Sequence, residues 1–190
     1  MGLEIEAKMK VDDLDEVRQR LETAGAIPAG EHLETNVFFD TPARALVHAD
    51  KGLRIRANRD VKSNRTEHIV TFKGARQPGP LKTRQEIEFI VSDPAAAAQV
   101  FQELGYALII SFQKHRRSWL LLGCKVELDE LPHLGTFVEI EGPNDRKVLH
   151  ARKALGLEDQ PIVTTSYAAL LANYLDEHKI SSRIVEFPSR

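Results

Sequence analysis

The chain has 190 residues, of which 42% are hydrophobic and 28% are charged, as expected for a folded domain with a substantial core. Its net charge of −2 does not indicate a broadly basic nucleic-acid-binding surface, and no apolar run approaches the roughly 18 residues of a membrane span. We therefore expect neither a nucleic-acid partner nor a membrane. The single cysteine, Cys124, cannot form an internal disulfide, and no signal-peptide pattern opens the chain, which favours a cytoplasmic location.

The first predicted element is a strand, because residues 3–10 alternate between apolar and charged side chains. Glu4, Glu6, Lys8 and Lys10 then share one face. Two carboxylates followed by two amines suit a site that binds a cation and an anion together. The Glu-Ile-Glu pattern recurs at 86–88 and 139–141. Each copy precedes a predicted helix, and these helices end near three glycines: Gly25, Gly105 and Gly156.

The later elements follow the same periodicities. Strands are predicted at 31–40, 53–56, 69–73, 82–89, 107–123, 125–129 and 138–141, and a final helix begins near Tyr167. Polar segments at 58–67 and 75–83 are predicted loops. Residues 1–178 are expected to form one domain, followed by a tail at 179–190. About eight strands and four helices with hairpin-like connections predict an α+β fold, namely an eight-stranded antiparallel β-barrel, or tunnel, with flanking helices.

The strand faces opposite the apolar residues are almost wholly ionic. If the apolar faces meet the helices, these charges point into a barrel that has room for side chains or one small ligand. The predicted acids are Glu4, Glu6, Glu86, Glu88, Glu127, Asp129, Glu139 and Glu141. The predicted bases include Lys8, Arg54, Arg56, Lys73, Lys82, Arg84, Lys114 and Arg116.

Charges in such an interior need partners, because uncompensated buried charge is costly. A triphosphate with a divalent cation supplies both kinds of partner. Carboxylate oxygens are the ligands that hard cations such as Mg²⁺ prefer, and the seven histidines have no zinc-site spacing. Arginine and lysine bind phosphate oxygens. The alternative is that each charged face is simply solvated. That interpretation suits one strand taken alone better than it suits all of them together.

Several motifs, in order along the chain, resemble the CYTH superfamily of triphosphate tunnel metalloenzymes. Residues 4–8 match its E-x-E-x-K signature, and 53–56, 71–74 and 84–88 resemble its L-R-x-R, T-x-K-G and R-x-E-x-E strands. Lys114, His115 and Arg116 with Trp119 are similar to its K-x-R-x-x-aromatic strand. Ser166 and Tyr167 resemble the start of its C-terminal helix; from the sequence, Tyr167 is expected to pack in the core or at the rim.

The resemblance implies a metal-dependent enzyme acting on a triphosphate-bearing small molecule, with Mg²⁺ or Mn²⁺ as cofactor. It implies metal ligands at Glu4, Glu6, Asp129, Glu139 and Glu141, and triphosphate-binding residues at Lys8, Arg54, Arg56, Lys73, Arg84, Lys114 and Arg116. The expected catalytic set is Glu4, Glu6, Lys8, Asp129 and Glu139. The expected supporting residues are Glu86, Glu88 and Glu127.

Two reactions use this machinery. Water can attack the terminal phosphorus of inorganic triphosphate or of a nucleoside or other organic triphosphate, or a ribose 3′-hydroxyl can attack the α-phosphorus of ATP to give cyclic AMP and pyrophosphate. We expect hydrolysis, with a class IV adenylyl cyclase as the alternative. A third possibility is a polyphosphate- or nucleotide-binding module without turnover. The sequence leaves the oligomeric state open between a monomer and a homodimer.

Overall fold

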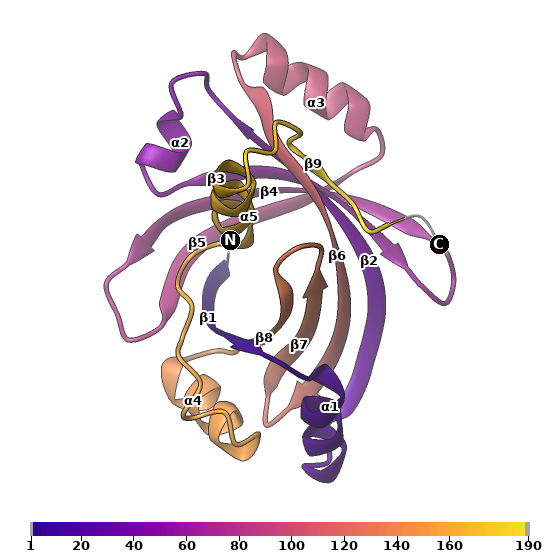
Figure 1. Ribbon diagram of the computed structural model, residues 1–190, viewed down its shortest axis with the longest axis vertical. Coiled ribbons are helices and arrows are strands. Elements are labelled where there is room, and N and C mark those ends of the chain that lie inside the picture. Colours follow the sequence, from indigo (N-terminus) through magenta and orange to yellow (C-terminus); the bar gives the residue numbers. More distant parts are fainter. Residues whose placement is uncertain (1, 189–190) are drawn as a thin grey trace.

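The computed structural model describes residues 2–188, which form nine strands and five helices (Figure 1). The strands are β1 (Gly2–Val11), β2 (Ile27–Asp40), β3 (Gly52–Asp60), β4 (Thr66–Gln77), β5 (Lys82–Val91), β6 (Ala107–Leu121), β7 (Cys124–Leu131), β8 (Gly135–Glu141) and β9 (Ile184–Val185). The helices are α1 (Leu14–Thr23), α2 (Ala45–His48), α3 (Pro94–Glu103), α4 (Asp145–Ala154) and α5 (Tyr167–Glu177). Residues 189–190 of the predicted tail lie outside the described residues.

Eight of the strands close into an antiparallel barrel. Their order is β2-β3-β4-β5-β1-β8-β7-β6, and β6 returns to β2 in a register that runs from Ile27 opposite Leu120 to Asp40 opposite Ala107. The predicted α+β barrel with flanking helices is confirmed. The two-residue strand β9 joins β6 in parallel at Ser111 and Phe112, so this part of the tail is part of the sheet.

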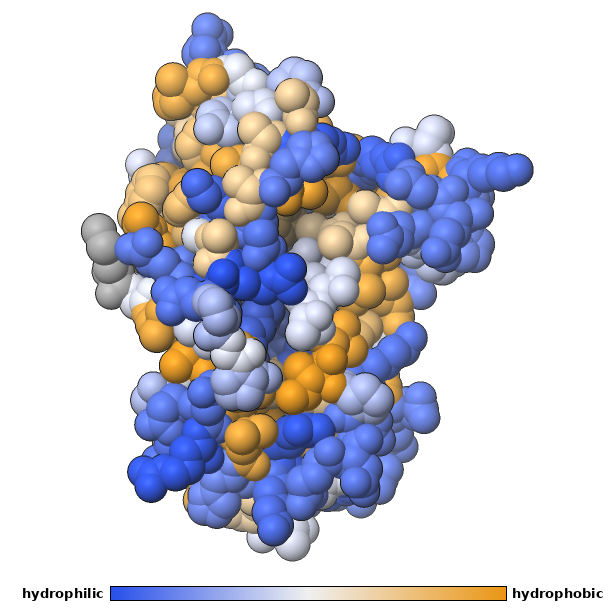
Figure 2. Space-filling view, turned by 90° about the vertical axis from the view of Figure 1, so that its left-hand side faces the viewer, coloured by the Kyte–Doolittle hydropathy of each residue, from blue (hydrophilic) through white to orange (hydrophobic). Residues whose placement is uncertain are grey.

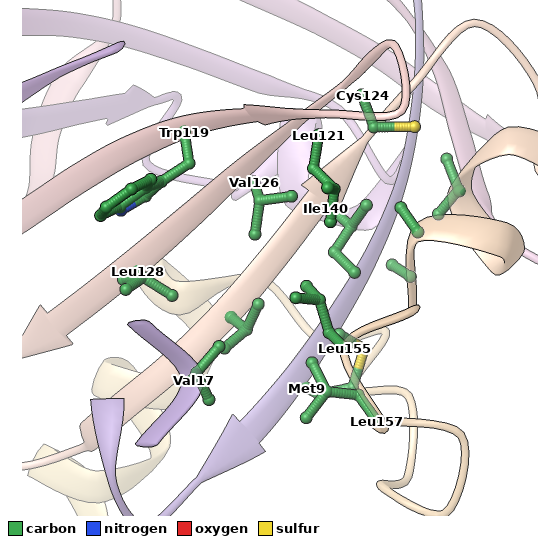
Figure 3. Packing of buried hydrophobic residues seen from close by; sticks show 14 of the residues in the cluster. Met9, Val17, Trp119, Leu121, Cys124, Val126, Leu128, Ile140, Leu155 and Leu157 are labelled. Carbon is green, nitrogen blue, oxygen red and sulfur yellow. The ribbon is translucent and has the colours of Figure 1, made fainter. Parts of the chain in front are cut away.

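The largest apolar core lies outside the barrel, where β1 and β6–β8 pack under α1 and α4 (Figure 3). Met9, Val126 and Ile140 point from the strands, while Val17 of α1 and Leu155, next to α4, close over them. All five are at most 3% exposed. Burial of side chains of this size stabilises the fold by roughly 1.5–3 kcal/mol each, so this core directs the opposite, charged faces inward.

A second cluster places α3 over β2–β4, where Phe101 packs edge-to-face on Phe39 at 5.3 Å. The outward apolar face of β5 is less well covered than this. Ile87 and Phe89 of this strand are 36% and 55% exposed. Apolar residues interrupt the hydrophilic surface in several places (Figure 2). Within residues 2–188, no helix has the length and apolar character needed to cross a membrane.

The helix ends follow the sequence signals. Asp13 accepts hydrogen bonds from the first turn of α1, and the three predicted glycines, Gly25, Gly105 and Gly156, follow α1, α3 and α4 with positive φ. The two loops predicted at 58–67 and 75–83 are shorter in the structure. Strand β3 continues to Asp60 and β4 begins at Thr66, because the strands pair beyond their apolar segments. Between β2 and β3, where the sequence pattern predicts no regular element, the chain forms the short helix α2.

Helix α5 differs from the other helices because it packs on the tunnel side. Its apolar residues Tyr167, Leu171 and Leu175 form a cluster with Ile110 and Phe112 of β6. The two β6 residues alternate in phase with Lys114 and Arg116, which face the tunnel. The tunnel face is therefore charged over much of its length and apolar beneath α5.

Candidate functional site

The barrel encloses a cavity of about 780 Å³, to which all eight barrel strands contribute. Its lining includes all of the predicted metal, triphosphate-binding and supporting residues except Asp129. Most of these charged side chains are buried, including Glu4, Glu6, Lys8, Lys114 and Glu139, each at most 8% exposed. The structure therefore brings the predicted site residues together around one interior space.

Carboxylates face one another across neighbouring strands. In the β1–β8 pair Glu6 lies directly opposite Glu141, and in the β7–β8 pair Glu127 lies directly opposite Glu139. Like charges directly opposite on one face destabilise a sheet. An arrangement that keeps two such pairs side by side is suited to binding a cation.

Lysines neutralise part of this acidic wall. The Lys73 Nζ donates to both carboxylate oxygens of Glu4, at 2.7 and 2.9 Å, and the Lys82 Nζ donates to Glu6. Among residues 2–188, no three acidic, histidine or cysteine side chains are gathered as a ready metal site. To bind a metal ion, Glu4 and Glu6 would therefore have to release Lys73 and Lys82.

The chemistry of the donor set nevertheless fits a divalent cation. Burial and the nearby carboxylates of Glu4 and Glu127 raise the pKa of Glu141 to about 7, despite the opposing charge of Lys125. Acids that suppress one another's ionisation in this way are relieved by a bound cation. Glu4, Glu6, Glu139 and Glu141 could supply the hard oxygen ligands that Mg²⁺ or Mn²⁺ prefers.

Arg116, on the neighbouring strand β6, is the central cation beside this acidic wall. Its Nε and Nη2 donate to the two carboxylate oxygens of Asp129, both at 2.6 Å, and Nη2 also reaches Glu139 at 2.5 Å. Its Nη1 pairs with Glu127. Although burial acts against the charge, the carboxylates of Asp129, Glu127 and Glu34 hold the pKa of Arg116 well above its usual value. Arg116 in turn helps to keep the pKa of Glu139 below its ordinary range, against the effect of burial.

Asp129 is fully buried and lies behind the cavity wall. Besides Arg116, its carboxylate accepts hydrogen bonds from the Lys114 Nζ at 3.3 Å and from the Tyr167 hydroxyl at 3.0 Å. Burial raises the pKa of Asp129 in spite of these cations. The predicted metal role of Asp129 stays a prediction, and its position favours a role in holding Arg116 and Lys114 in place.

Lys8 and Lys114 lie over the ring of Tyr167, with Nζ atoms 4.2 and 5.3 Å from its centroid. Lys8 also donates to the carbonyl oxygen of Thr165 at 2.6 Å. Burial and the neighbouring charges of Lys82 and Lys114 lower the pKa of Lys8 to about 8, against the pull of Glu139 and Glu6. Tyr167 thus fixes cations that line the cavity.

The remaining predicted phosphate-binding residues come from β3, β4 and β5. Arg54 donates to Thr71 at 3.1 Å and lies 3.6 Å from Glu88. Its buried Nε has no hydrogen-bond partner among the described residues, and the same holds for the Nε of Arg84. Buried donors without partners are uncommon in folded proteins. Both arginines line the cavity, where an anion could accept these hydrogen bonds.

Three further residues belong to this network but were not among the predicted site residues: Glu34, Asn36 and Tyr167. Lys82, which was predicted as an inward-facing base without a binding role, also belongs to it. Glu34 is 2% exposed and lies 3.3 Å from Arg56 and 3.2 Å from Lys114. Asn36 accepts a hydrogen bond from the Arg56 Nε at 3.1 Å. The alternation along β2 places Glu34 and Asn36 on the tunnel face, so extending that pattern would have found both.

Comparison with known proteins agrees with this architecture. The family model described as the CYTH domain matches residues 2–166. The chain belongs to the CYTH domain family. The match covers the whole barrel and stops at the N-cap residue of α5, Ser166.

Several known proteins are similar to this chain over nearly their full length. MJ0240 of Methanocaldococcus jannaschii, whose name assigns it provisionally as an adenylate cyclase, is 28% identical over 177 residues, which are 88% of this chain and 98% of that protein. The structure of PH1819 from Pyrococcus horikoshii OT3 superposes with a TM-score of 0.76 at 25% identity, over 90% of this chain and 99% of that one. HpAC1 from Hippeastrum, described as having a dominant triphosphatase activity, shares the fold with a TM-score of 0.66 at 18% identity, over 92% and 96% of the two chains.

Proposed function

We propose that this CYTH domain is a divalent-metal-dependent enzyme that hydrolyses a triphosphate-bearing small molecule inside the barrel. The observation that carries the proposal is the strand register that sets Glu6 opposite Glu141 and Glu127 opposite Glu139, within a cavity that many lysine and arginine side chains also line. Acids in this arrangement suit a cation, and the surrounding bases suit a polyanion.

The basic residues would bind and orient the triphosphate. Arginine forks can form bidentate contacts with phosphate oxygens, whereas lysines act as point charges. Lys8, Arg54, Arg56, Lys73, Arg84, Lys114 and Arg116 carry this role, and Lys82 is added to them. Because phosphoryl transfer depends mainly on positioning and charge stabilisation, a rigid set of such groups suits the reaction.

Glu4, Glu6, Glu139 and Glu141 would hold Mg²⁺ or Mn²⁺. When bound, such an ion offsets charge on the phosphate oxygens and activates water. In hydrolysis, the oxygen of water forms a bond to the terminal phosphorus, and the bond from that phosphorus to the bridging oxygen breaks. The diphosphate-bearing remainder departs as the leaving group, and the attacked phosphoryl group, once the attacking water has lost a proton to solvent, is released as orthophosphate. Lys73 and Lys82, which pair with Glu4 and Glu6 here, could then turn to the substrate's phosphates.

Cyclisation of ATP is the second candidate, and the name of the M. jannaschii relative favours it. The purified protein should be incubated with tripolyphosphate and with ATP, each with Mg²⁺ or Mn²⁺, and the products separated. Metal-dependent release of orthophosphate supports hydrolysis, whereas cyclic AMP with pyrophosphate supports the cyclase. Tight binding without any product would contradict both and indicate a binding module.

The cellular setting is part of the same proposal. A reducing cytoplasm suits a chain whose single cysteine, Cys124, is buried and unpaired. Small triphosphates are the partners that the cavity favours.

A further inference from the structure

Strand β2 supplies none of the predicted phosphate-binding residues, yet its inward-facing acid and amide contact the cations of both neighbouring strands. Glu34 lies directly opposite Lys114 in the β2–β6 register, and Asn36 lies directly opposite Arg56 in the β2–β3 register. Strand β2 therefore lies between the two strands that carry these cations, at the seam where the barrel closes.

The carboxylate of Glu34 lies among three cations. Its Oε1 lies 3.3 Å from the Arg56 Nη1 and 3.9 Å from the Arg116 Nε, and its Oε2 lies 3.2 Å from the Lys114 Nζ. Asn36 adds to these contacts. Its Nδ2 donates to the Glu34 Oε2 at 3.4 Å, and its Oδ1 accepts from the Arg56 Nε at 3.1 Å. The guanidinium of Arg56 is thus held by two neighbouring side chains of β2.

Glu34 lies behind the cations that a ligand would meet. It is 2% exposed and does not line the cavity, whereas Arg56, Lys114 and Arg116 do. Asp129 of β7 has the same relation to Lys114, whose Nζ lies 3.3 Å from its Oδ2. An ammonium group has three donors, so these two buried acids leave one for a phosphate in the cavity.

Stability alone does not account for an ionised acid at this position. Although burial acts against ionisation, the charges of Arg56, Lys114 and Arg116 hold the pKa of Glu34 well below its usual value. Replacing buried ion pairs with apolar side chains is often neutral or stabilising. What the carboxylate provides is a fixed direction for long, flexible cationic side chains that would otherwise repel one another.

We infer that Glu34 is a positioning residue, which fixes Arg56 and Lys114 at the spacing that neighbouring phosphate groups of one ligand require. This inference rests on the proposed function for the identity of the ligand. Displacement of either cation would weaken a contact that depends on both, because binding through several groups requires them in register. Glu34 acts through these cations and does not touch the ligand.

Two variants separate the position of the carboxylate from its charge. Glu34→Asp keeps the charge but withdraws it by one methylene, whereas Glu34→Gln keeps the shape and loses the charge. Glu31→Asp and Glu31→Gln are the matched controls, because the Glu31 side chain is 44% exposed on the same strand and pairs with His115.

Calorimetry with tripolyphosphate and Mg²⁺ measures the Kd and, through the stoichiometry, the fraction of protein that can bind. We expect Kd to rise by about threefold or more in Glu34→Asp and by about tenfold or more in Glu34→Gln, at the wild-type stoichiometry. The two Glu31 variants should stay within about twofold of wild type. In an Arg56→Gln background, Glu34→Asp should raise Kd by a smaller factor, because one of the side chains that it positions is already lost.

Several results would overturn the inference. A carboxylate that only offsets positive charge would give tighter binding in Glu34→Gln, because the cavity becomes more positive, and an unchanged Kd in Glu34→Asp. A lower stoichiometry at an unchanged Kd would indicate a purely structural role. An equal factor for Glu34→Asp in the Arg56→Gln background would show that Glu34 does not act through Arg56.

The outcomes also separate this inference from the proposed function. Binding by wild type without turnover, together with the expected changes in Kd, would uphold the role of Glu34 and overturn the enzyme. Turnover by wild type with an unchanged Kd in Glu34→Asp and Glu34→Gln would overturn the role of Glu34 and leave the enzyme standing. Failure of wild type to bind tripolyphosphate would overturn the inference, whereas turnover of ATP would still decide on the enzyme.

Discussion

The hydroxyl of Tyr167, the first residue of α5, donates a 3.0 Å hydrogen bond to Asp129, which lies behind the cavity wall on β7. The ring of the same tyrosine lies under Lys8. One side chain thus connects the C-terminal helix to Lys8 of β1 and, through Asp129, to Arg116 of β6. Through these contacts α5, which is not part of the barrel, can affect the charged residues that line the cavity.

Tyr167→Phe should keep the ring and lose the hydrogen bond. Because the bond is buried and its acceptor is a carboxyl group, we expect a loss of about 1–3 kcal/mol in the free energy of unfolding. Tripolyphosphate binding should weaken as Lys8 and Lys114 become less fixed. Urea denaturation and calorimetry measure the two effects. Tyr174→Phe, which removes a hydroxyl from the same helix, should change neither; equal effects from both variants would argue against the role of Tyr167.

Replacing Arg116 should be far more damaging than replacing its neighbour. Arg116→Ala leaves Asp129, Glu127 and Glu139 buried without their main cation, and breaking a buried pair in this way costs about 3–5 kcal/mol. Arg117 points to the other face of β6, and its side chain is 28% exposed. Arg117→Ala should therefore change the unfolding free energy by less than about 1 kcal/mol. Similar losses in the two variants would contradict the central position of Arg116.

The affinity for tripolyphosphate should fall as the pH rises through about 8. Burial lowers the pKa of Lys8 to about 8, so the free protein loses this positive charge above that pH. Binding of an anion requires the protonated form, and the Kd should rise by up to about tenfold per pH unit there. Lys8→Arg keeps its positive charge at these pH values and should abolish this rise in Kd. A step of the same size in both proteins would assign the titration to another group.

The metal-free protein should lose stability as the pH rises from about 4.5 to 7. Burial and neighbouring acids raise the pKa of Glu141 to about 7, so the folded state favours the protonated form. The contribution of Glu141 to the free energy of unfolding is therefore fully present below the pKa that this residue has in the unfolded chain. It is lost as the pH rises through its pKa in the folded protein. Glu141→Gln should flatten the profile, and Mn²⁺ should raise Tm more at pH 8 than at pH 6. A steeper profile in Glu141→Gln would contradict this assignment.

The tunnel face could be predicted from sequence because alternation is a local property. Once Glu4 is known to face inward, Glu6 and Lys8 must do so as well. The same rule could have extended to Glu34, two residues before Asn36 on β2. Sequence motifs also gave the family, which the match over residues 2–166 confirms.

The rest depends on contacts between distant segments. The pairing of β2 with β6 decides that the sheet closes, and no short pattern specifies that partnership. Alternation likewise placed Asp129 on the charged face but could not show that Arg116 and Tyr167 separate it from the cavity. The apolar stripe of α5 predicted a buried helix face without indicating that it would pack on the tunnel side, where the helix lines part of the cavity.

The most direct test of a metal-dependent triphosphate enzyme is orthophosphate release from tripolyphosphate and from ATP by wild type and Glu4→Gln, with and without Mn²⁺. Glu130→Gln, at an exposed site on β7, is the matched control. We predict metal-dependent release by wild type and Glu130→Gln, and a loss of at least about 100-fold in Glu4→Gln, whose circular dichroism and Tm should show that it stays folded. Release by Glu4→Gln at the wild-type rate, or release by wild type that does not depend on the metal, would contradict the account.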